Sequence, residues 1–322
     1  MLFRSPITTL HYDPAWATGY GTRSFNWETS VGVQQEITPR VSMTAMYYRR
    51  IYGNFVVTRN TLVSAADYDP YCITAPSDPR LPGGGGQQIC DLYDLNPSKV
   101  GLVDQLRSDS GKYGNQYDNW NGVDVTMNAR LPHGPLLQGG VSTGKKMRDN
   151  CQIVAAIGNP STYNCHQETP FLTQTKFLAS YPLPWWGVQL SGAFQRATYE
   201  PTGSINASAT VTGMSALYVA TNAVIAPSLG RNLSSATNAT IDLLTRNPGL
   251  YFDAMTLVDL RSAKTFRVGR AKVQGQFDVY NLLNDNTALN FNTAYGTNGA
   301  SWATPLAAVP GRIVRFGVQM NF

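Results

Sequence analysis

Residues 311–322 read G-R-I-V-R-F-G-V-Q-M-N-F, and this stretch sets the pattern on which the fold prediction rests. Every second position is apolar from residue 314 onward, and most of the positions between are polar or small. A β-strand points successive side chains to opposite faces, so this stretch predicts a strand with one apolar and one polar face. Water-soluble sheets show the same alternation, so its meaning depends on whether the rest of the chain repeats it. The apolar series is Val314, Phe316, Val318, Met320 and Phe322.

The composition narrows the class of protein. Hydrophobic residues make up 43% of the 322 residues and charged residues only 14%, against about 25% charged in a typical soluble domain. No run of about 18 apolar residues occurs, which excludes helical membrane spans. The net charge of +5 comes from scattered Lys and Arg, whereas a nucleic-acid binder concentrates them. Low charge with alternating apolar residues is typical of a transmembrane β-barrel, and we predict no nucleic-acid partner.

Alternating segments recur nine times along the chain. Each is bounded by Gly, Pro, Asn or Asp residues of the kind that form turns. The segments are 24–36, 41–58, 116–131, 136–143, 170–180, 188–196, 253–266, 271–283 and 311–322.

The connections between these segments alternate strictly between short and long. This pattern is typical of up-and-down outer-membrane barrels, in which periplasmic turns are short and extracellular loops are long. We therefore predict an all-β, antiparallel up-and-down transmembrane β-barrel with a periplasmic C-terminus, located in the outer membrane of a Gram-negative-type bacterium. The short connections are 37–40, 132–135, 182–187 and 267–270, and the predicted extracellular loops are 59–115, 144–169, 197–252 and 284–310.

A soluble β-sandwich is the main alternative fold. In a sandwich the aromatic residues form one shared core, and loop length has no preference for one end of the sheet. Loops as long as residues 59–115 are rare in compact domains, so the loop pattern favours the barrel.

The four cysteines fall in pairs within two of the long loops. Cys72 and Cys90 lie in the first, and Cys151 and Cys165 lie in the second. An even number of cysteines in such segments indicates two local disulfides and an oxidising compartment. Zinc binding and free thiols are the alternatives, but the spacings lack the C-x₂-C form of a zinc site.

Charged residues on the polar series of the strands are candidates for the wall of a water-filled lumen. Their ordinary role is to solvate that wall and to balance charge along it. A functional role would be to dock a plug domain or to pass a polar solute. The candidates are Glu28, Asp118, Asp124, Arg130, Lys176, Asp259, Arg261, Asp278 and Arg315.

No catalytic, metal or cofactor site is predicted. Residues 139–145, G-G-V-S-T-G-K, resemble a phosphate-binding loop, but Lys146 stands where the motif needs Ser or Thr, and no helix pattern follows. His11, His133 and His166 lie in three separate segments without convergent partners. We recognise no nucleophile with a neighbouring base, so we do not expect an enzyme.

Several stretches resemble TonB-dependent outer-membrane receptors, most closely the Oar-like branch, whose members often carry an N-terminal carboxypeptidase-regulatory-like domain. The likeness spans nearly the whole chain. The stretches are F-D-V-Y-N-L-L-N-D-N-T (277–287), R-I-V-R-F-G-V-Q-M-N-F (312–322), S-A-K-T-F-R-V-G-R (262–270), D-Y-D-P-Y-C-I-T-A-P (67–76), R-L-P-G-G-G-G (80–86) and N-G-V-D-V-T-M-N-A-R-L-P (121–132).

The resemblance implies a 22-stranded barrel with an N-terminal plug and a TonB box. This sequence shows about nine strands and neither of those segments, and no signal peptide follows Met1. We therefore expect the C-terminal portion of a receptor. Nine strands leave two unpaired edges, which lipid does not tolerate, so we expect a curved open sheet or a small closed barrel.

The resemblance also implies the function and the partners. The whole receptor would bind a ligand through its extracellular loops and import it, with energy from the TonB complex acting on the N-terminal part. Outer-membrane lipid would surround the barrel, and the barrel-assembly machinery would recognise the last strand through Phe316, Val318, Met320 and Phe322. The alternative is a self-contained small outer-membrane barrel with a structural or adhesive role. The ligand is not readable from the sequence.

Overall fold

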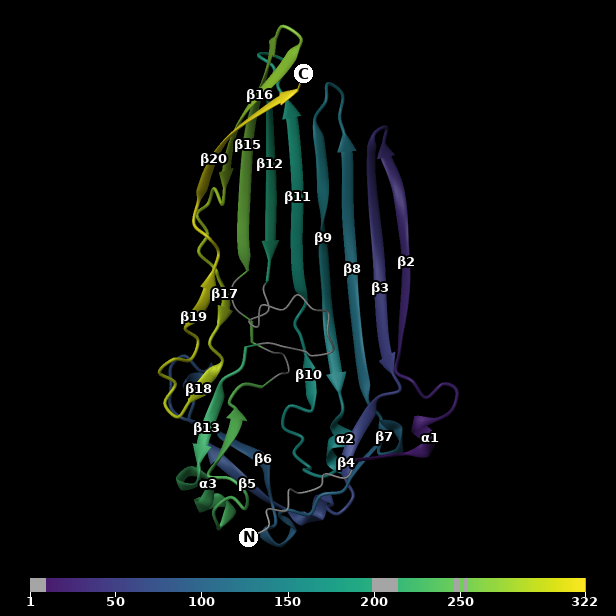
Figure 1. Ribbon diagram of the computed structural model, residues 1–322, viewed down its shortest axis with the longest axis vertical. Coiled ribbons are helices and arrows are strands. Elements are labelled where there is room, and N and C mark those ends of the chain that lie inside the picture. The colour runs from purple at the N-terminus through teal and green to yellow at the C-terminus, as the bar shows by residue number, and fades with distance from the viewer. Residues whose placement is uncertain (1–9, 199–213, 246–249, 252–253, 322) are drawn as a thin grey trace.

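The largest element of the computed structural model is one long antiparallel sheet (Figure 1). The structure describes residues 10–198, 214–245, 250–251 and 254–321. Nine strands follow one another across the sheet in chain order, each antiparallel to its neighbours, so the prediction of an all-β antiparallel fold is confirmed. The strands are β2 (Phe25–Thr38), β3 (Val41–Gly53), β8 (Tyr117–Arg130), β9 (Leu136–Asp149), β11 (Leu172–Pro182), β12 (Val188–Ala197), β15 (Met255–Val268), β16 (Ala271–Tyr280) and β20 (Ile313–Asn321).

The register carries the two series of side chains across the whole sheet. Directly opposed residues of an antiparallel pair lie on the same face. Val125 opposes Val141, for example, and Phe277 opposes Phe316. The same rule links every strand to the next, which gives the sheet an apolar face and a polar face. The apolar face includes Trp27, Val31, Tyr47, Val125, Val141, Phe177, Phe194, Leu260, Phe277, Phe316, Val318 and Met320.

The short and long connections lie at opposite ends of the sheet. Figure 1 shows the tight hairpins at the top and the long connections at the bottom. The predicted boundary at residue 143 was wrong, because β9 continues to Asp149. Residues 144–149 read G-K-K-M-R-D and lack the alternation, but they pair with β8 on one side and with β10 (His166–Glu168) on the other. The first long connection likewise begins at residue 54, where β3 ends.

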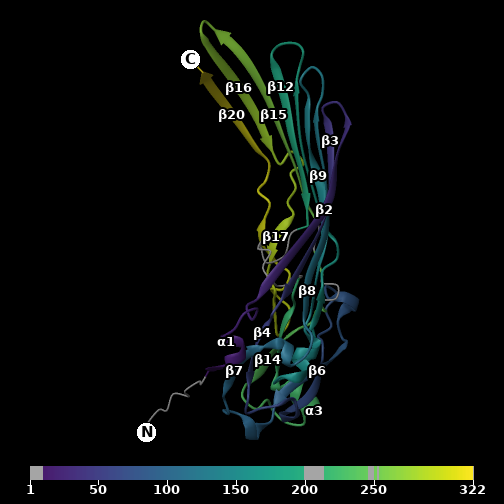
Figure 2. The ribbon, with the colours of Figure 1, turned by 90° about the vertical axis from the view of Figure 1, so that its right-hand side faces the viewer.

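The sheet is open and curved, and a small closed barrel is not seen (Figure 2). Within the described ranges, β2 pairs only with β3 and β20 pairs only with β16. Because neighbouring strands are antiparallel and β20 is the ninth strand counted from β2, the two edge strands run in the same direction. They therefore cannot complete an antiparallel barrel by pairing with each other.

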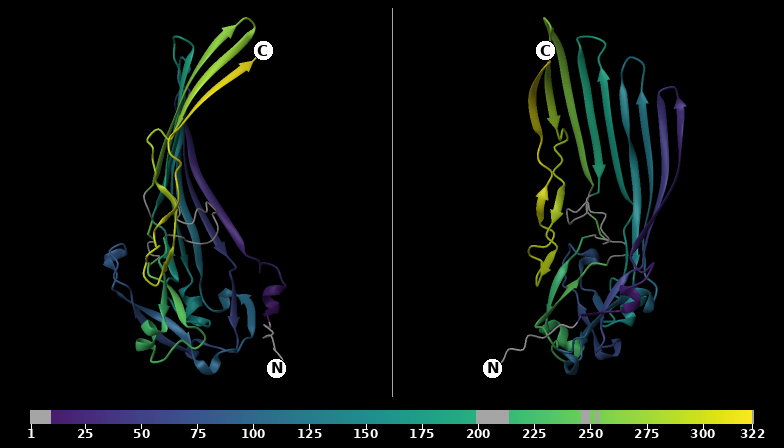
Figure 3. Two further views of the ribbon diagram at one scale, coloured as in Figure 1. Left: turned by 60° about the vertical axis from the view of Figure 1, so that its left-hand side comes forward. Right: turned by 45° about the vertical axis from the view of Figure 1, so that its right-hand side comes forward.

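The long connections fold together into a second unit, which we call the loop cap (Figure 3). Together with the segment before β2, these connections form four small sheets, ordered β1-β7-β4, β14-β13-β18, β17-β19 and β5-β6. The strands are β1 (Leu10–Tyr12), β4 (Val56–Asn60), β5 (Tyr68–Thr74), β6 (Gln88–Leu95), β7 (Gln105–Asp109), β13 (Leu217–Thr221), β14 (Asn238–Asp242), β17 (Ala288–Phe291), β18 (Ala294–Gly296) and β19 (Pro305–Ala308). The helices are α1 (Pro14–Ala17), α2 (Cys151–Ala156) and α3 (Asn222–Leu229), with 3₁₀ turns at Ala65–Asp67, Pro82–Gly84, Pro97–Lys99 and Ser110–Lys112.

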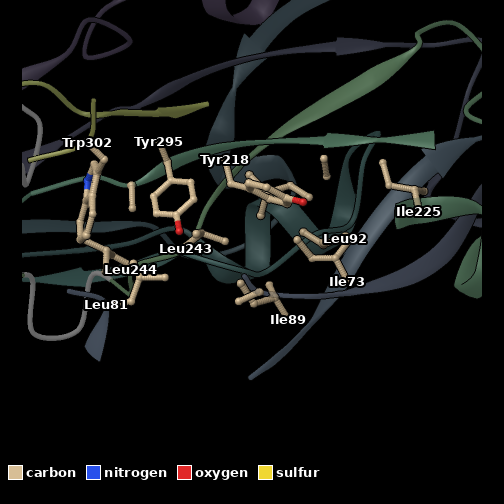
Figure 4. Close-up of a cluster of buried hydrophobic side chains, with 14 of the residues drawn as sticks. Ile73, Leu81, Ile89, Leu92, Tyr218, Ile225, Leu243, Leu244, Tyr295 and Trp302 are labelled. Carbon is tan, nitrogen blue, oxygen red and sulfur yellow. The ribbon is translucent and has the colours of Figure 1, made fainter. Parts of the chain in front are cut away.

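The buried hydrophobic core lies in the loop cap (Figure 4). Trp302 and Tyr295 are each 2% exposed, and their ring centroids lie 5.6 Å apart. The indole nitrogen of Trp302 donates a hydrogen bond of 2.8 Å to the carbonyl oxygen of Ser215. The core therefore joins three long connections that the sequence analysis treated as loops. Its members are Tyr71, Ile73, Ala75, Leu81, Ile89, Leu92, Met214, Ala216, Tyr218, Ala220, Ile225, Ile241, Leu243, Leu244, Tyr295 and Trp302.

Candidate functional site

The predicted lumen-facing residues all fall on the polar face of the sheet. The register shows this, because opposed residues lie on the same face: Asp278 opposes both Arg261 and Arg315, and Lys176 opposes Gln195. Asp124 lies on the same side of its strand as Gly122, which opposes Gly144. The side chains on this face include Glu28, Asp118, Asp124, Arg130, Lys176, Asp259, Arg261, Asp278 and Arg315.

Asp278 is the centre of the tightest charge cluster on this face. Its carboxylate is 2% exposed. Arg261 donates to it from Nε at 2.6 Å, and Arg315 donates from Nε at 3.0 Å. The buried carboxylate lies between two guanidinium groups, and the short, charge-assisted hydrogen bonds to them compensate its negative charge. The cluster connects β15, β16 and β20, so its plainest role is to hold the last three strands together.

Two further ion pairs involve residues that the sequence analysis did not select. Arg50 donates from Nε to Glu28 at 2.9 Å, and the Lys146 ammonium lies 3.7 Å from the Asp118 carboxylate. Arg50 follows the polar series of its strand, so parity indicated its face, but only the register brings it opposite Glu28. No ion pair joins Asp124, Arg130 or Lys176 to another described residue.

Two shallow depressions meet at Lys176 near the middle of the polar face. Each has a volume of about 380 Å³. Gln138 and Gly139 contribute to both, and Asp259 lines one of them. The Asp259 carboxylate also accepts a hydrogen bond of 2.8 Å from the backbone N–H of Asn281. The depression that Asp259 lines is bounded mainly by apolar side chains, whereas the other is bounded mainly by amide, hydroxyl and glycine residues.

A partly buried group of polar contacts in the loop cap joins the first long connection to the last. The Arg80 guanidinium bonds Asp78 and donates to the carbonyl oxygens of Trp302 at 3.0 Å and Gly299 at 2.6 Å. The Tyr295 hydroxyl donates to Asp78 at 3.1 Å. The Arg80 side chain, followed by its backbone N–H, holds the pKa of the Asp78 carboxyl well below its ordinary value of 3.8. The carboxylate form therefore stabilises this contact at neutral pH.

A second set of contacts joins the remaining connections. Arg231, after α3, bonds Asp69 at 2.6 Å and also forms an ion pair with Asp94. The Tyr163 hydroxyl donates to the carbonyl oxygen of Asp242 at 2.7 Å, and the Ser161 hydroxyl donates to that of Asp91 at 2.6 Å. All four long connections are thus held in one folded unit.

Both predicted disulfides are present and lie in the loop cap. Cys72–Cys90 joins β5 to β6 beside the core, and Cys151–Cys165 closes the second long connection. The alternatives of zinc binding and free thiols are therefore set aside.

The three histidines remain apart, as their sequence positions indicated. The His166 ring lies 2.8 Å from the Asp149 carboxylate and His11 lies 3.0 Å from that of Asp104, whereas His133 is in a turn between β8 and β9. Across the part of the chain that the structure describes, no group of three or more His, Cys, Asp or Glu is arranged to hold a metal ion. Over the same residues, no helix has the length and apolar character needed to cross a membrane.

Not every predicted residue is described. Phe322 and Asp253 lie outside the described residues, as do residues 199–213 of the third long connection. The other three residues of the predicted assembly signal lie on the apolar face, where Phe316 is 79% exposed. Comparison with protein-family models gives no match, and comparison with curated proteins gives none either.

Proposed function

We propose that this chain is part of a TonB-dependent outer-membrane transporter, which binds a ligand through its loop cap and imports it across the outer membrane. The observation that carries the proposal is the nine-stranded sheet with one exposed apolar face, one polar face and all its long connections at one end. Transmembrane barrels need this combination, because one face contacts lipid and the other lines water.

The exposure of the apolar face supports a lipid environment. Trp27 and Val318 are each 69% exposed, and Val31 is 66% exposed. A soluble sandwich would cover such a face with a second layer, because large exposed apolar patches mark interaction surfaces. No described element packs as a layer over this face, and lipid is the covering that its width and alternation suit.

The sheet edges support a larger barrel. An open edge in lipid leaves unpaired backbone groups at a cost of several kcal/mol each. Since β2 and β20 run in the same direction, antiparallel closure needs an odd number of further strands between them. A barrel of 22 strands would supply thirteen, which is an odd number, so the resemblance and the strand directions are consistent.

The remaining parts of the proposal follow from the resemblance. The loop cap would face the extracellular medium and the hairpins the periplasm. The TonB complex would act on an N-terminal plug, and the barrel-assembly machinery would recognise the β20 strand. The bound ligand would pass along the polar face of the sheet.

A quenching experiment tests the membrane half of the proposal. The full chain, refolded into phosphatidylcholine vesicles with brominated acyl chains, should lose the fluorescence of Trp27 on the apolar face, so Trp27→Phe should remove most of the quenching. Trp120→Phe is the matched control, because Trp120 lies on the polar face. Quenching that Trp120→Phe removes and Trp27→Phe leaves intact would refute the proposal, because the polar face would then contact the lipid.

The transport half has a separate test. Genomic sequence upstream of Met1 that encodes a plug domain in the same reading frame supports the importer. A stop codon directly upstream, together with a separate signal-bearing start, would contradict it and favour a small structural or adhesive barrel.

A further inference from the structure

Trp120 lies flat on the polar face of the sheet over two glycines. A Cβ atom added to Gly122 would lie 2.5 Å from Cζ2 of the indole, and a Cβ added to Gly144 would lie 2.5 Å from the same atom. Contacts this short do not occur in real side chains, so the ring occupies space that only glycine leaves free. Both glycines are buried while Trp120 is half-buried. One face of the indole therefore covers backbone, and the other faces the open side of the sheet.

Polar side chains surround this indole and form a small depression with it. Its volume is about 200 Å³, and it is lined by Trp120 with Glu28, Tyr48, Arg50 and Asp124. Glu28 comes from β2, Tyr48 and Arg50 come from β3, and Asp124 lies on β8 with the indole. The depression is thus an aromatic floor with a rim of carboxylates, a guanidinium group and a phenol hydroxyl.

We propose that this depression, which we call the Trp120 platform, binds a pyranose ring of a saccharide. The apolar C–H face of such a ring carries small positive charges that match the negative face of an aromatic ring. Its hydroxyl groups both donate and accept hydrogen bonds around the ring edge. The rim offers both partners, since carboxylates accept, Arg50 donates and the Tyr48 hydroxyl does either.

The charges near the platform favour a neutral polyol over an organic cation. Glu28 is neutralised by Arg50, and on the neighbouring strand Lys146 is paired with Asp118. Asp124 is the one rim carboxylate for which the described residues provide no ion pair. A quaternary ammonium ligand would need an aromatic cage with uncompensated negative charge, whereas here a positive guanidinium group lines the same depression.

The proposal rests on the proposed transporter function and names its class of solute. The platform lies on the face that would line the lumen, so a saccharide moving along that face would meet it. The volume suits one sugar unit, which indicates a transient contact along a longer chain rather than a deep binding pocket.

The test measures saccharide affinity of the full chain by isothermal titration calorimetry. The protein is kept in a polyoxyethylene detergent, because detergents with sugar head groups would compete. The probes are maltotriose, cellotriose and chitotriose, each alone, with choline chloride as the cationic probe. At least one trisaccharide should bind, and choline should not.

Variants link the affinity to the platform. Trp120→Ala should raise the Kd about tenfold, which corresponds to about 1.4 kcal/mol. Gly122→Ala keeps the indole but displaces it, because the three atoms nearest to the added Cβ all belong to the Trp120 ring. We expect a rise in Kd of about fivefold, within the energy of one stacked ring. Trp186→Ala is the control, since Trp186 is 76% exposed in a turn, and it should leave the Kd unchanged.

The outcomes separate this inference from the transporter proposal. Absence of trisaccharide binding, binding unchanged in both Trp120→Ala and Gly122→Ala, or choline binding that depends on Trp120 would each overturn the platform. None of these results bears on the quenching by brominated lipid. If Trp120→Ala does not fold, as judged by circular dichroism, Trp120→Phe and Gly122→Ala still decide the question.

Discussion

The main sheet and the loop cap bury their side chains in opposite ways. Every residue of β2 is exposed, and the apolar face stays open along the whole sheet. In the loop cap, Trp302, Ile225 and Leu244 are each no more than 2% exposed. The cap therefore resembles a water-soluble domain with its own core, whereas the sheet has backbone pairing but no covered face. One chain therefore holds one region with a covered apolar core and another region whose apolar side chains stay exposed.

The two regions also depend on different forces. The hydrophobic effect in water stabilises the folded cap, because folding removes its apolar side chains from solvent. If the sheet lies in lipid, as we propose, its backbone pairing contributes most to stability there, because an unpaired backbone group in lipid costs several kcal/mol. Changes to the cap should therefore act equally in water and in vesicles, whereas changes to the apolar face should act only in vesicles.

The largest expected effect comes from the cap core. Trp302→Ala removes a buried ring and its hydrogen bond to Ser215, and we expect a loss of about 3 to 5 kcal/mol in the free energy of unfolding of the cap. Urea unfolding monitored by circular dichroism measures it. Trp186→Ala, at an exposed turn, should change that free energy by less than about 0.5 kcal/mol. Equal effects of the two variants would contradict the assignment of the core.

Removal of the disulfide beside the core should have the next largest effect. The double variant Cys72→Ala with Cys90→Ala frees a loop of 18 residues, and we expect a loss of about 3 kcal/mol. Protease resistance of the cap measures the result. The pair Cys151→Ala with Cys165→Ala is the control, because it lies outside the core cluster. If the control variant loses more resistance than the first, the cap is not organised around the core of β5 and β6.

A charged residue placed on either face of one strand tests directly which face of the sheet contacts lipid. Val125→Arg places a guanidinium group on the apolar face, and Thr126→Arg places one on the polar face of the same strand, β8. In vesicles the first should cost about 2 kcal/mol in the free energy of unfolding, and the second close to zero. In aqueous solution without lipid the two should be alike. A larger cost for Thr126→Arg in vesicles would reverse the assignment of the faces.

The smallest effect that we predict is a dependence on pH confined to the cap. The pKa of Asp78 in the folded protein lies below its ordinary value of 3.8, mainly because Arg80 binds the carboxylate. Its stabilising contribution is therefore complete above that ordinary value and is lost as the pH falls through the lower, folded-state pKa. Unfolding of the wild type and of Asp78→Asn, compared from pH 7 to pH 2, should differ by a constant amount down to about pH 4 and then converge. A difference that persists unchanged to pH 2 would exclude this role.

The sequence predicted the sheet well because strand alternation is a local property. All nine strands were placed, and the faces of Lys176, Asp278 and Arg315 followed from parity alone. The end of β9 was missed because residues 144–149 contain one large apolar residue, Met147, and no apolar series. The ion pair between Glu28 and Arg50 was also missed. These residues meet across a hairpin, and the sequence of neither strand alone shows how the two strands are aligned.

The loop cap escaped the sequence analysis because its core is not local. Ile73, Tyr218 and Trp302 lie in three connections, and their contact depends on the tertiary fold rather than on residues close together in the sequence. Prolines, glycines and polar residues dominate between them, which led us to describe these segments as loops.

The sequence by itself determined the nine strands of the main sheet, the side of the sheet on which each side chain lies, the ends at which short and long connections meet, and the two disulfide pairs. Each of these depends on residues close together in the chain. Only the tertiary structure decided that the sheet stays open, that Asp278 holds three strands together, that Trp120 lies over Gly122 and Gly144, and that the long connections share one core. Each of these depends on register or on contacts between distant segments, and no local pattern records them.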